Sequence, residues 1–390
     1  AIQLDAALYW RVKTLHDQLD ELGLDAEQRY LVQRHFREMT HAGAALDDET
    51  KEQLKALNLR LSSLTTTFEK NLLADTNELA LIVDDVAELD GLTSGELSAA
   101  AQAATDRGHE GAYALTLTLY TGHPYLSMLT NRATRKRLMD ASRTKSNRGG
   151  PNDNREVLLE IARLRADRAA LLGYDNHAAY VTADETAGSP EAVHALLRQL
   201  APPAAANALR EQAALQAIAD AEPEPFALAA EDWAFYTEKV RQAEYDIDTT
   251  ALRPWFEAER VLQDGVFFAA NKLYGVTFTE RPDLVAYHPD ARVFELHNED
   301  GSALGLFVLD LYTRDTKRGG AWMNPIVSQS RLRGTKPVVV NNLNVPKPAP
   351  GEPTLLTLDE VGTLFHEFGH ALHGLFAVVT YPHFAGTNVF

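Results

Sequence analysis

The run Leu364-Phe365-His366-Glu367-Phe368-Gly369-His370-Ala371-Leu372-His373 decides the fold class of this chain. His366 and His370 stand four residues apart, so on a helix they share one face, with about 5–6 Å between their Cβ atoms. Two imidazoles on one helical face can reach a single metal ion. Glu367 follows the first histidine, where its carboxylate can take a proton from a water molecule at that metal. The spacing therefore predicts a zinc-binding helix.

The residues around the motif support a buried helix. Thr357, followed three positions later by Glu360, is a capping-box pattern that predicts the start of the helix. Apolar side chains recur at helical spacing on both sides of the motif. They are Leu355, Leu356, Leu358, Val361, Leu364, Phe365, Phe368, Leu372, Leu375 and Phe376.

Two other interpretations of the motif are weaker. His366 and His370 could be core histidines, but a buried, unpaired Glu367 between them would cost several kcal/mol without a metal or a partner. His373 lies about 10 Å along the helix from His366, too far to complete a tetrahedral site, so we expect it to be structural. Phe376 stands where the extended metzincin pattern needs histidine, which excludes that class. The motif is typical of a zincin active-site helix.

Composition narrows the function classes. The chain has 390 residues, 37 basic and 55 acidic, giving a net charge of −18. This balance argues against nucleic acid or an anionic membrane as a partner, because both need clustered cations. There is no cysteine, which excludes disulfides and thiol catalysis. No apolar run is long enough for a transmembrane helix. We expect a cytoplasmic protein, with periplasmic export as the alternative.

The order of patterns predicts a mainly α protein with a small β-sheet beside the metal-binding helix. Leucines and Phe68 recur at helical spacing over residues 54–68, and further helices are expected at residues 158–171, 190–221 and 255–274. Short strands are expected at residues 79–83, 114–119, 276–279, 291–297, 303–312 and 337–340. We expect three parts: a helical lobe at residues 1–150, whose start lies upstream, a helical scaffold at 151–275, and the sheet with the metal-binding helix at 276–390.

Gly319-Gly320-Ala321-Trp322 is a candidate substrate-binding segment. Two glycines let another backbone approach closely, so an extended peptide could add to the sheet edge here. The alternative is a hairpin or bulge in which Trp322 fills the core. The cations Arg314, Lys317, Arg318 and Arg331 could bind a substrate carboxylate, although pairing with Asp310 and Asp315 is the commoner role for such residues.

The chain resembles the thimet-oligopeptidase-type zinc metallopeptidases (M3), and within them bacterial peptidyl-dipeptidases (dipeptidyl carboxypeptidases). The resemblance spans nearly the whole chain. It rests on the extended histidine run and on six further segments in the family's order. These are residues 232–236, 287–293, 309–323, 337–344, 351–356 and 373–376.

The resemblance implies a two-lobed helical body that admits short, unfolded peptides. It implies that His366 and His370 bind one Zn²⁺ per active site and that Glu367 is catalytic. It also implies a third metal ligand, a glutamate, expected beyond Phe390, so that a C-terminal portion or second chain would complete the site. The expected activity is release of C-terminal dipeptides. The alternatives are an endo-oligopeptidase of the same family and an inactive helical peptide-binding fragment that lacks the third ligand.

Overall fold

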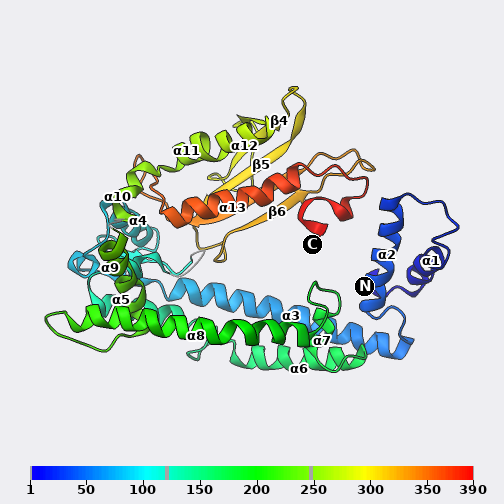
Figure 1. Ribbon diagram of the computed structural model, residues 1–390, viewed down its shortest axis with the longest axis horizontal. Helices are drawn as coiled ribbons and strands as arrows, with labels where there is room; N and C mark the ends of the chain where they lie inside the picture. The colour runs from blue at the N-terminus through cyan, green and yellow to red at the C-terminus, as the bar shows by residue number, and fades with distance from the viewer. Residues whose placement is uncertain (1, 119–122, 246–248, 390) are drawn as a thin grey trace. The chain divides into compact units, whose positions relative to one another are not determined.

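The computed structural model describes residues 2–118, 123–245 and 249–389 (Figure 1). The chain forms two compact units, each built from two separate segments. The first unit comprises Ala1–Ala74 and Ser146–Ala213, and the second comprises Asp75–Lys145 and Ala214–Phe390. The three-part division at residues 150 and 275 stays a prediction about organisation. No helix among the described residues has the length and apolar character needed to cross a membrane.

The first unit is helical. The long leucine seam predicted at residues 54–68 packs Leu61 and Leu64 against Ile161 of the neighbouring helix. Gly173, at φ +81°, follows the end of that neighbouring helix. The unit contains η1 (Ile2–Leu4), α1 (Ala6–Asp17), α2 (Ala26–His41), most of α3 (Asp48–Glu78), α6 (Arg155–Leu171), α7 (His177–Thr182) and most of α8 (Pro190–Asp220).

The second unit combines helices with both sheets. Its α-helices are α4 (Ser94–Thr105), α5 (Arg132–Arg143), α9 (Trp233–Tyr245), α10 (Thr249–Leu252), α11 (Ala258–Arg260), α12 (Phe268–Tyr274) and α13 (Leu358–Leu375). Its 3₁₀ turns are η2 (Val86–Leu89), η3 (Pro124–Ser127), η4 (Ala230–Asp232), η5 (Arg253–Trp255), η7 (Pro382–Phe384) and η8 (Gly386–Val389). A buried ion-pair network joins two of these elements: the fully buried Asp232 binds Arg132 and Arg135 of α5, at 2.8 and 2.9 Å.

A five-stranded mixed sheet lies in the second unit, in the order β3-β4-β5-β7-β6. All neighbours are antiparallel except β5 and β7, which are parallel. A separate antiparallel pair joins β1 to β2. The strands are β1 (Leu81–Val83), β2 (Tyr113–Leu115), β3 (Thr277–Glu280), β4 (Arg292–His297), β5 (Ala303–Tyr312), β6 (Trp322–Val327) and β7 (Val338–Val345).

Every strand predicted from the sequence is present, although the predicted segment at 114–119 ends at residue 115 and its last residue lies outside the described ranges. β6 was not predicted as a strand. Pro325 lies within it, and three of its six residues are exposed, so no alternating apolar pattern marks it. The prediction of a mainly α protein with a small sheet is confirmed.

The helix α13, which carries the histidine motif, packs along the sheet against β5, β6 and β7 (Figure 1). The main core of the second unit lies in this interface, where Leu364, Phe368 and Leu375 meet Phe307 and Val339. The sheet was predicted to lie beside this helix. Its pleated, apolar face therefore supports the helix that carries the histidine motif.

The helix predicted at residues 255–274 is wrong as an uninterrupted α-helix. Residues Val261–Phe267 (η6) form a π-helical segment between α11 and α12. Gly265 lies in this segment, where a Cβ atom would come within 3.3 Å of the Phe365 ring of α13. The π-helical segment thus accompanies a close approach to α13, which a local sequence pattern does not reveal.

Candidate active site

The start of α13 is fixed by the predicted capping box. The backbone N–H of Glu360 donates to Oγ1 of Thr357 at 3.1 Å, and the N–H of Thr357 donates to the Glu360 carboxylate at 2.7 Å. One face of the helix is buried in the core. The opposite face, which carries His366 and His370, is exposed. Local capping and packing therefore hold both imidazoles toward solvent on a rigid element.

His366 and His370 have the geometry of a metal-binding pair. Their Nε2 atoms lie 3.1 Å apart, and the two ring planes are inclined by 82°. Zinc–nitrogen bonds are about 2.0–2.1 Å long, so two nitrogens at this separation can bind one ion. The exposed side chains let an ion reach them from solvent. These two residues fit zinc.

Glu367 is nearly buried, with 8% of its surface exposed. Among the described residues, none forms an ion pair or hydrogen bond with its carboxylate. A carboxylate on a nearly buried residue beside two histidines is a candidate for a catalytic task. Glu367 directly follows His366 in the chain and so lies beside the histidine pair.

A third ligand is not present in the described part of the chain. Within residues 2–118, 123–245 and 249–389, no His, Cys, Asp or Glu forms a three-residue ligand group with His366 and His370 within 4.8 Å. His373 is exposed and does not form such a group with the pair. Catalytic zinc usually has three protein ligands. The described residues therefore place two candidate ligands at this site and no third beside them.

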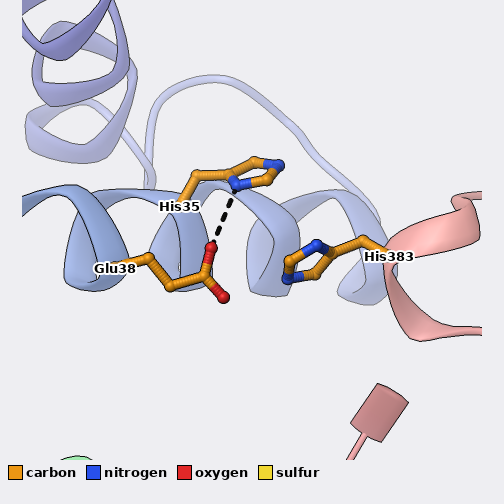
Figure 2. Close-up of side chains that lie close together, drawn as sticks. All are labelled: His35, Glu38 and His383. Carbon is orange, nitrogen blue, oxygen red and sulfur yellow. Dashed lines mark ion pairs between the residues drawn. The ribbon is translucent and has the colours of Figure 1, made fainter. Parts of the chain in front are cut away.

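Figure 2 shows His35 and Glu38, which lie on α2 in the first unit with 3.5 Å between Nδ1 and a carboxylate oxygen. Residues three apart on a helix often pair in this way. We treat His35 and Glu38 as such a contact.

The candidate substrate-binding segment leads into the edge strand of the sheet. Gly320 has φ +101° in the turn before β6, a backbone region that favours glycine. Trp322 is half-buried and begins β6, and the Arg318 guanidinium lies 5.1 Å from the centre of its ring. Among the residues that the structure describes, β6 pairs only with β7, so its other side is an edge of the sheet. Such an edge can accept an extended peptide as a further strand.

A buried ionic cluster anchors the loop between β5 and β6. The fully buried Asp310 accepts two hydrogen bonds from Arg314, both 2.7 Å long, and one from Lys317 at 3.2 Å. Asn344 of β7 donates to the backbone carbonyls of Arg318 and Gly320 at 3.0 and 2.7 Å. These bonds fix the turn that leads into the edge strand.

The pKa values in this cluster follow from burial and pairing. Burial alone would raise the pKa of Asp310, but hydrogen bonds from Arg314 and Tyr287 outweigh it and lower the pKa. Burial lowers the pKa of Lys317 to about 8, against the opposing effect of Asp310. Arg314 and Lys317, candidates for a substrate carboxylate, are therefore occupied by Asp310. The sequence offered this pairing only as an alternative, because the burial of Asp310 is a tertiary property.

A second ionic cluster, which the sequence analysis missed, lies at the start of α13. Arg253 binds Glu96 and donates to the backbone carbonyl of Leu355 at 2.8 Å. Glu96 is the capping-box residue of α4, as Glu360 is of α13, and both are buried. The only sequence signal was the matching pair of capping-box patterns. Arg253 thus links the start of α4 to the segment that precedes α13.

Comparison with known proteins places the chain in a family. The model of peptidase family M3 matches residues 125–390. The dipeptidyl carboxypeptidase of Salmonella typhimurium is 43% identical over 387 residues, which cover 99% of this chain and 57% of that protein. The dipeptidyl carboxypeptidase of Escherichia coli is 42% identical over the same shares.

Oligopeptidase A of Escherichia coli is also similar, at 37% identity over 94% of this chain and 55% of that protein. The chain therefore spans a little more than half the length of these curated relatives. The family match covers the sheet, the edge strand and the helix that carries the histidine pair. This chain belongs to peptidase family M3.

Proposed function

We propose that this chain is the catalytic part of a zinc metallopeptidase that hydrolyses short, unfolded peptides and releases dipeptides from their C-termini. The observation that carries the proposal is the pair of Nε2 atoms 3.1 Å apart, with the nearly buried Glu367 beside them. The similarity to two dipeptidyl carboxypeptidases supports the choice of product.

In this proposal His366 and His370 hold one zinc ion, whose Lewis acidity makes a water molecule nucleophilic at neutral pH. Glu367 takes a proton from the attacking water and then delivers it to the nitrogen of the leaving amine. Water is thus added across the peptide C–N bond, which gives a free carboxylate and a free amine. The free edge of β6 holds the substrate backbone in an extended conformation.

A third ligand, a glutamate, comes from a further portion of the protein. The support for this proposal is twofold. The described residues provide only two ligands at the site, and the relatives are nearly twice as long as the matched segment. That further portion, on the same chain or on a second one, is the expected partner, along with the peptide substrate.

The second candidate is an endo-oligopeptidase with the same chemistry, which the similarity to oligopeptidase A favours. The two candidates differ in whether the enzyme requires a free carboxylate two residues after the cleaved bond. The test uses the complete enzyme and matched peptides of five residues or so, one a free acid and one a C-terminal amide.

Mass spectrometry of the products decides between the candidates. For a dipeptide-releasing enzyme we expect the free acid to lose a C-terminal dipeptide and the amide to be cleaved at least ~10-fold more slowly, because a charge-assisted bond to the carboxylate is lost. Equal cleavage of both peptides at an internal bond would favour the endo-oligopeptidase. Cleavage of neither peptide by the zinc-loaded enzyme would contradict both.

A further inference from the structure

A cavity of about 1040 Å³ lies in the second unit beside the first two turns of α13. Its walls come mainly from α9, from α13 and from the region around η3, which precedes α5. Figure 1 labels α5, α9 and α13. From α13 it is lined by Thr357, Leu358, Asp359 and Gly362. The cavity is large enough for one or two bulky side chains of a ligand.

The cavity opens on the helical face that carries the histidine pair. Gly362 precedes His366 by four residues, and Leu358 precedes it by eight, so all three lie on the same side of α13. At about 1.5 Å per residue, Gly362 lies ~6 Å and Leu358 ~12 Å from His366 along the helix axis. Gly362 and Leu358 therefore line the cavity on the side of α13 that carries His366.

Glycine at position 362 has no packing reason in the described structure. A Cβ atom added there would meet no other atom within 4 Å. Glycine inside a helix costs about 1 kcal/mol relative to alanine, and nothing in the second unit offsets this cost by close packing. A bare backbone on the ligand-facing side of the helix suits close approach by an extended peptide.

The lining chemistry selects for an apolar group. Trp233 and Phe235 of α9 are half-buried at the wall, and Leu358 is 56% exposed, an unfavourable state for an apolar side chain in water. The cations at the wall have partners: Arg241 pairs with Glu238, and Lys239 pairs with Glu222. The cavity thus offers apolar contact surface with neutralised charges at its rim.

We propose that this cavity binds an apolar or aromatic side chain of the peptide substrate, at a residue about two to four positions from the bond that is cleaved. This inference rests on the proposed function, because it takes the cleaved bond to lie at His366 and His370. An extended peptide advances about 3.3 Å per residue, so the axial distances of ~6 and ~12 Å correspond to that span. The cavity would make the enzyme prefer peptides with an apolar or aromatic side chain at that position.

The test compares peptides in which one phenylalanine is moved along a background of glycine and alanine. With the complete enzyme we expect kcat/KM to rise about 10-fold or more when phenylalanine occupies one position in that span. Thr237→Trp fills the cavity from α9, because Thr237 is part of its lining. Ala243→Trp is the matched control, since Ala243 lies on the same helix, is exposed and does not line the cavity.

The phenylalanine preference should disappear in Thr237→Trp and persist in Ala243→Trp. Gln242→Trp is a second filling variant at an exposed lining position, for use if Thr237→Trp does not fold. A preference unchanged in the folded filling variants, or none in the unmodified enzyme, would overturn the proposal. Calorimetric binding of the same peptides to Glu367→Gln tests the cavity separately from the proposed peptidase activity, because binding can be measured even if no peptide is hydrolysed.

Discussion

Glu367 is the residue at which structure and chemistry are most closely joined. The residue is 8% exposed, and none of the described residues pairs with its carboxylate. A positive ion at the adjacent histidine pair would stabilise the ionised carboxylate, which could then take a proton from a water molecule at that ion.

Replacing Glu367 with glutamine separates these two roles. The amide keeps the size of the side chain but cannot accept a proton, so turnover in the complete enzyme should fall by about 10²–10⁴-fold. Zinc content should stay unchanged, because His366 and His370 are intact. Peptide hydrolysis and elemental analysis of the same preparations measure both effects. Near-normal turnover would give Glu367 a structural role, and Glu352→Gln, at an exposed loop position, is the control.

At the scale of single residues, the sequence predicted what one helix contains by itself. The histidine pair, Glu367 and the capping box of Thr357 and Glu360 are all local to α13, so helical spacing places them correctly. The burial of Asp310 and the contact of Arg253 with Glu96 depend on segments far apart in the chain. No short pattern reports such pairings.

At the scale of elements, the start of α13 is held by a capping box whose glutamate, Glu360, is buried. Burial of its negative charge costs stability. Burial raises the pKa of Glu360 above its ordinary value, although bonds from Thr357 and the charge of Arg253 oppose the shift. A carboxyl group with a raised folded pKa binds its proton more tightly in the native state. The cost of burying the ionised Glu360 carboxylate is therefore absent at pH values below the pKa of the unfolded state. It appears as the pH rises toward the pKa of the folded state and is complete above that pKa.

Glu360→Gln should consequently stabilise the protein at higher pH. Glutamine also serves at this position of a capping box, so α13 keeps its start. Urea denaturation at about pH 8 should give a larger free energy of unfolding for the variant than for the unmodified chain, and the difference should vanish near about pH 4. A variant less stable at the higher pH would mean that the attraction to Arg253 exceeds the cost of burial.

The elements that were mispredicted share one cause. β6 has no apolar alternation because it is an edge strand with exposed residues, and Val261–Phe267 is π-helical where Gly265 meets the Phe365 ring. Both features are set by neighbours in space. The central strands β5 and β7 are mostly buried, so their apolar runs identified them.

At the scale of the whole molecule, the described residues supply a scaffold with two proposed zinc ligands, His366 and His370. Catalytic zinc sites generally have three protein ligands, and loss of a ligand weakens zinc retention. In addition, four leucines of α8 are more than half exposed: Leu196, Leu197, Leu200 and Leu209. Apolar surface of this kind is typical of a face that packs against further protein.

We therefore expect residues 1–390 alone to bind zinc weakly and to hydrolyse no peptide. Joined to the further portion found in its longer relatives, the chain should hold one zinc ion per site, because a glutamate then completes the ligand set. Elemental analysis after exhaustive dialysis measures the zinc content of both forms. In the complete protein His370→Ala should lose stoichiometric zinc, whereas His288→Ala, outside α13, should keep it. Tight zinc binding and peptide hydrolysis by residues 1–390 as a monomer would overturn this expectation and place the third ligand within this chain.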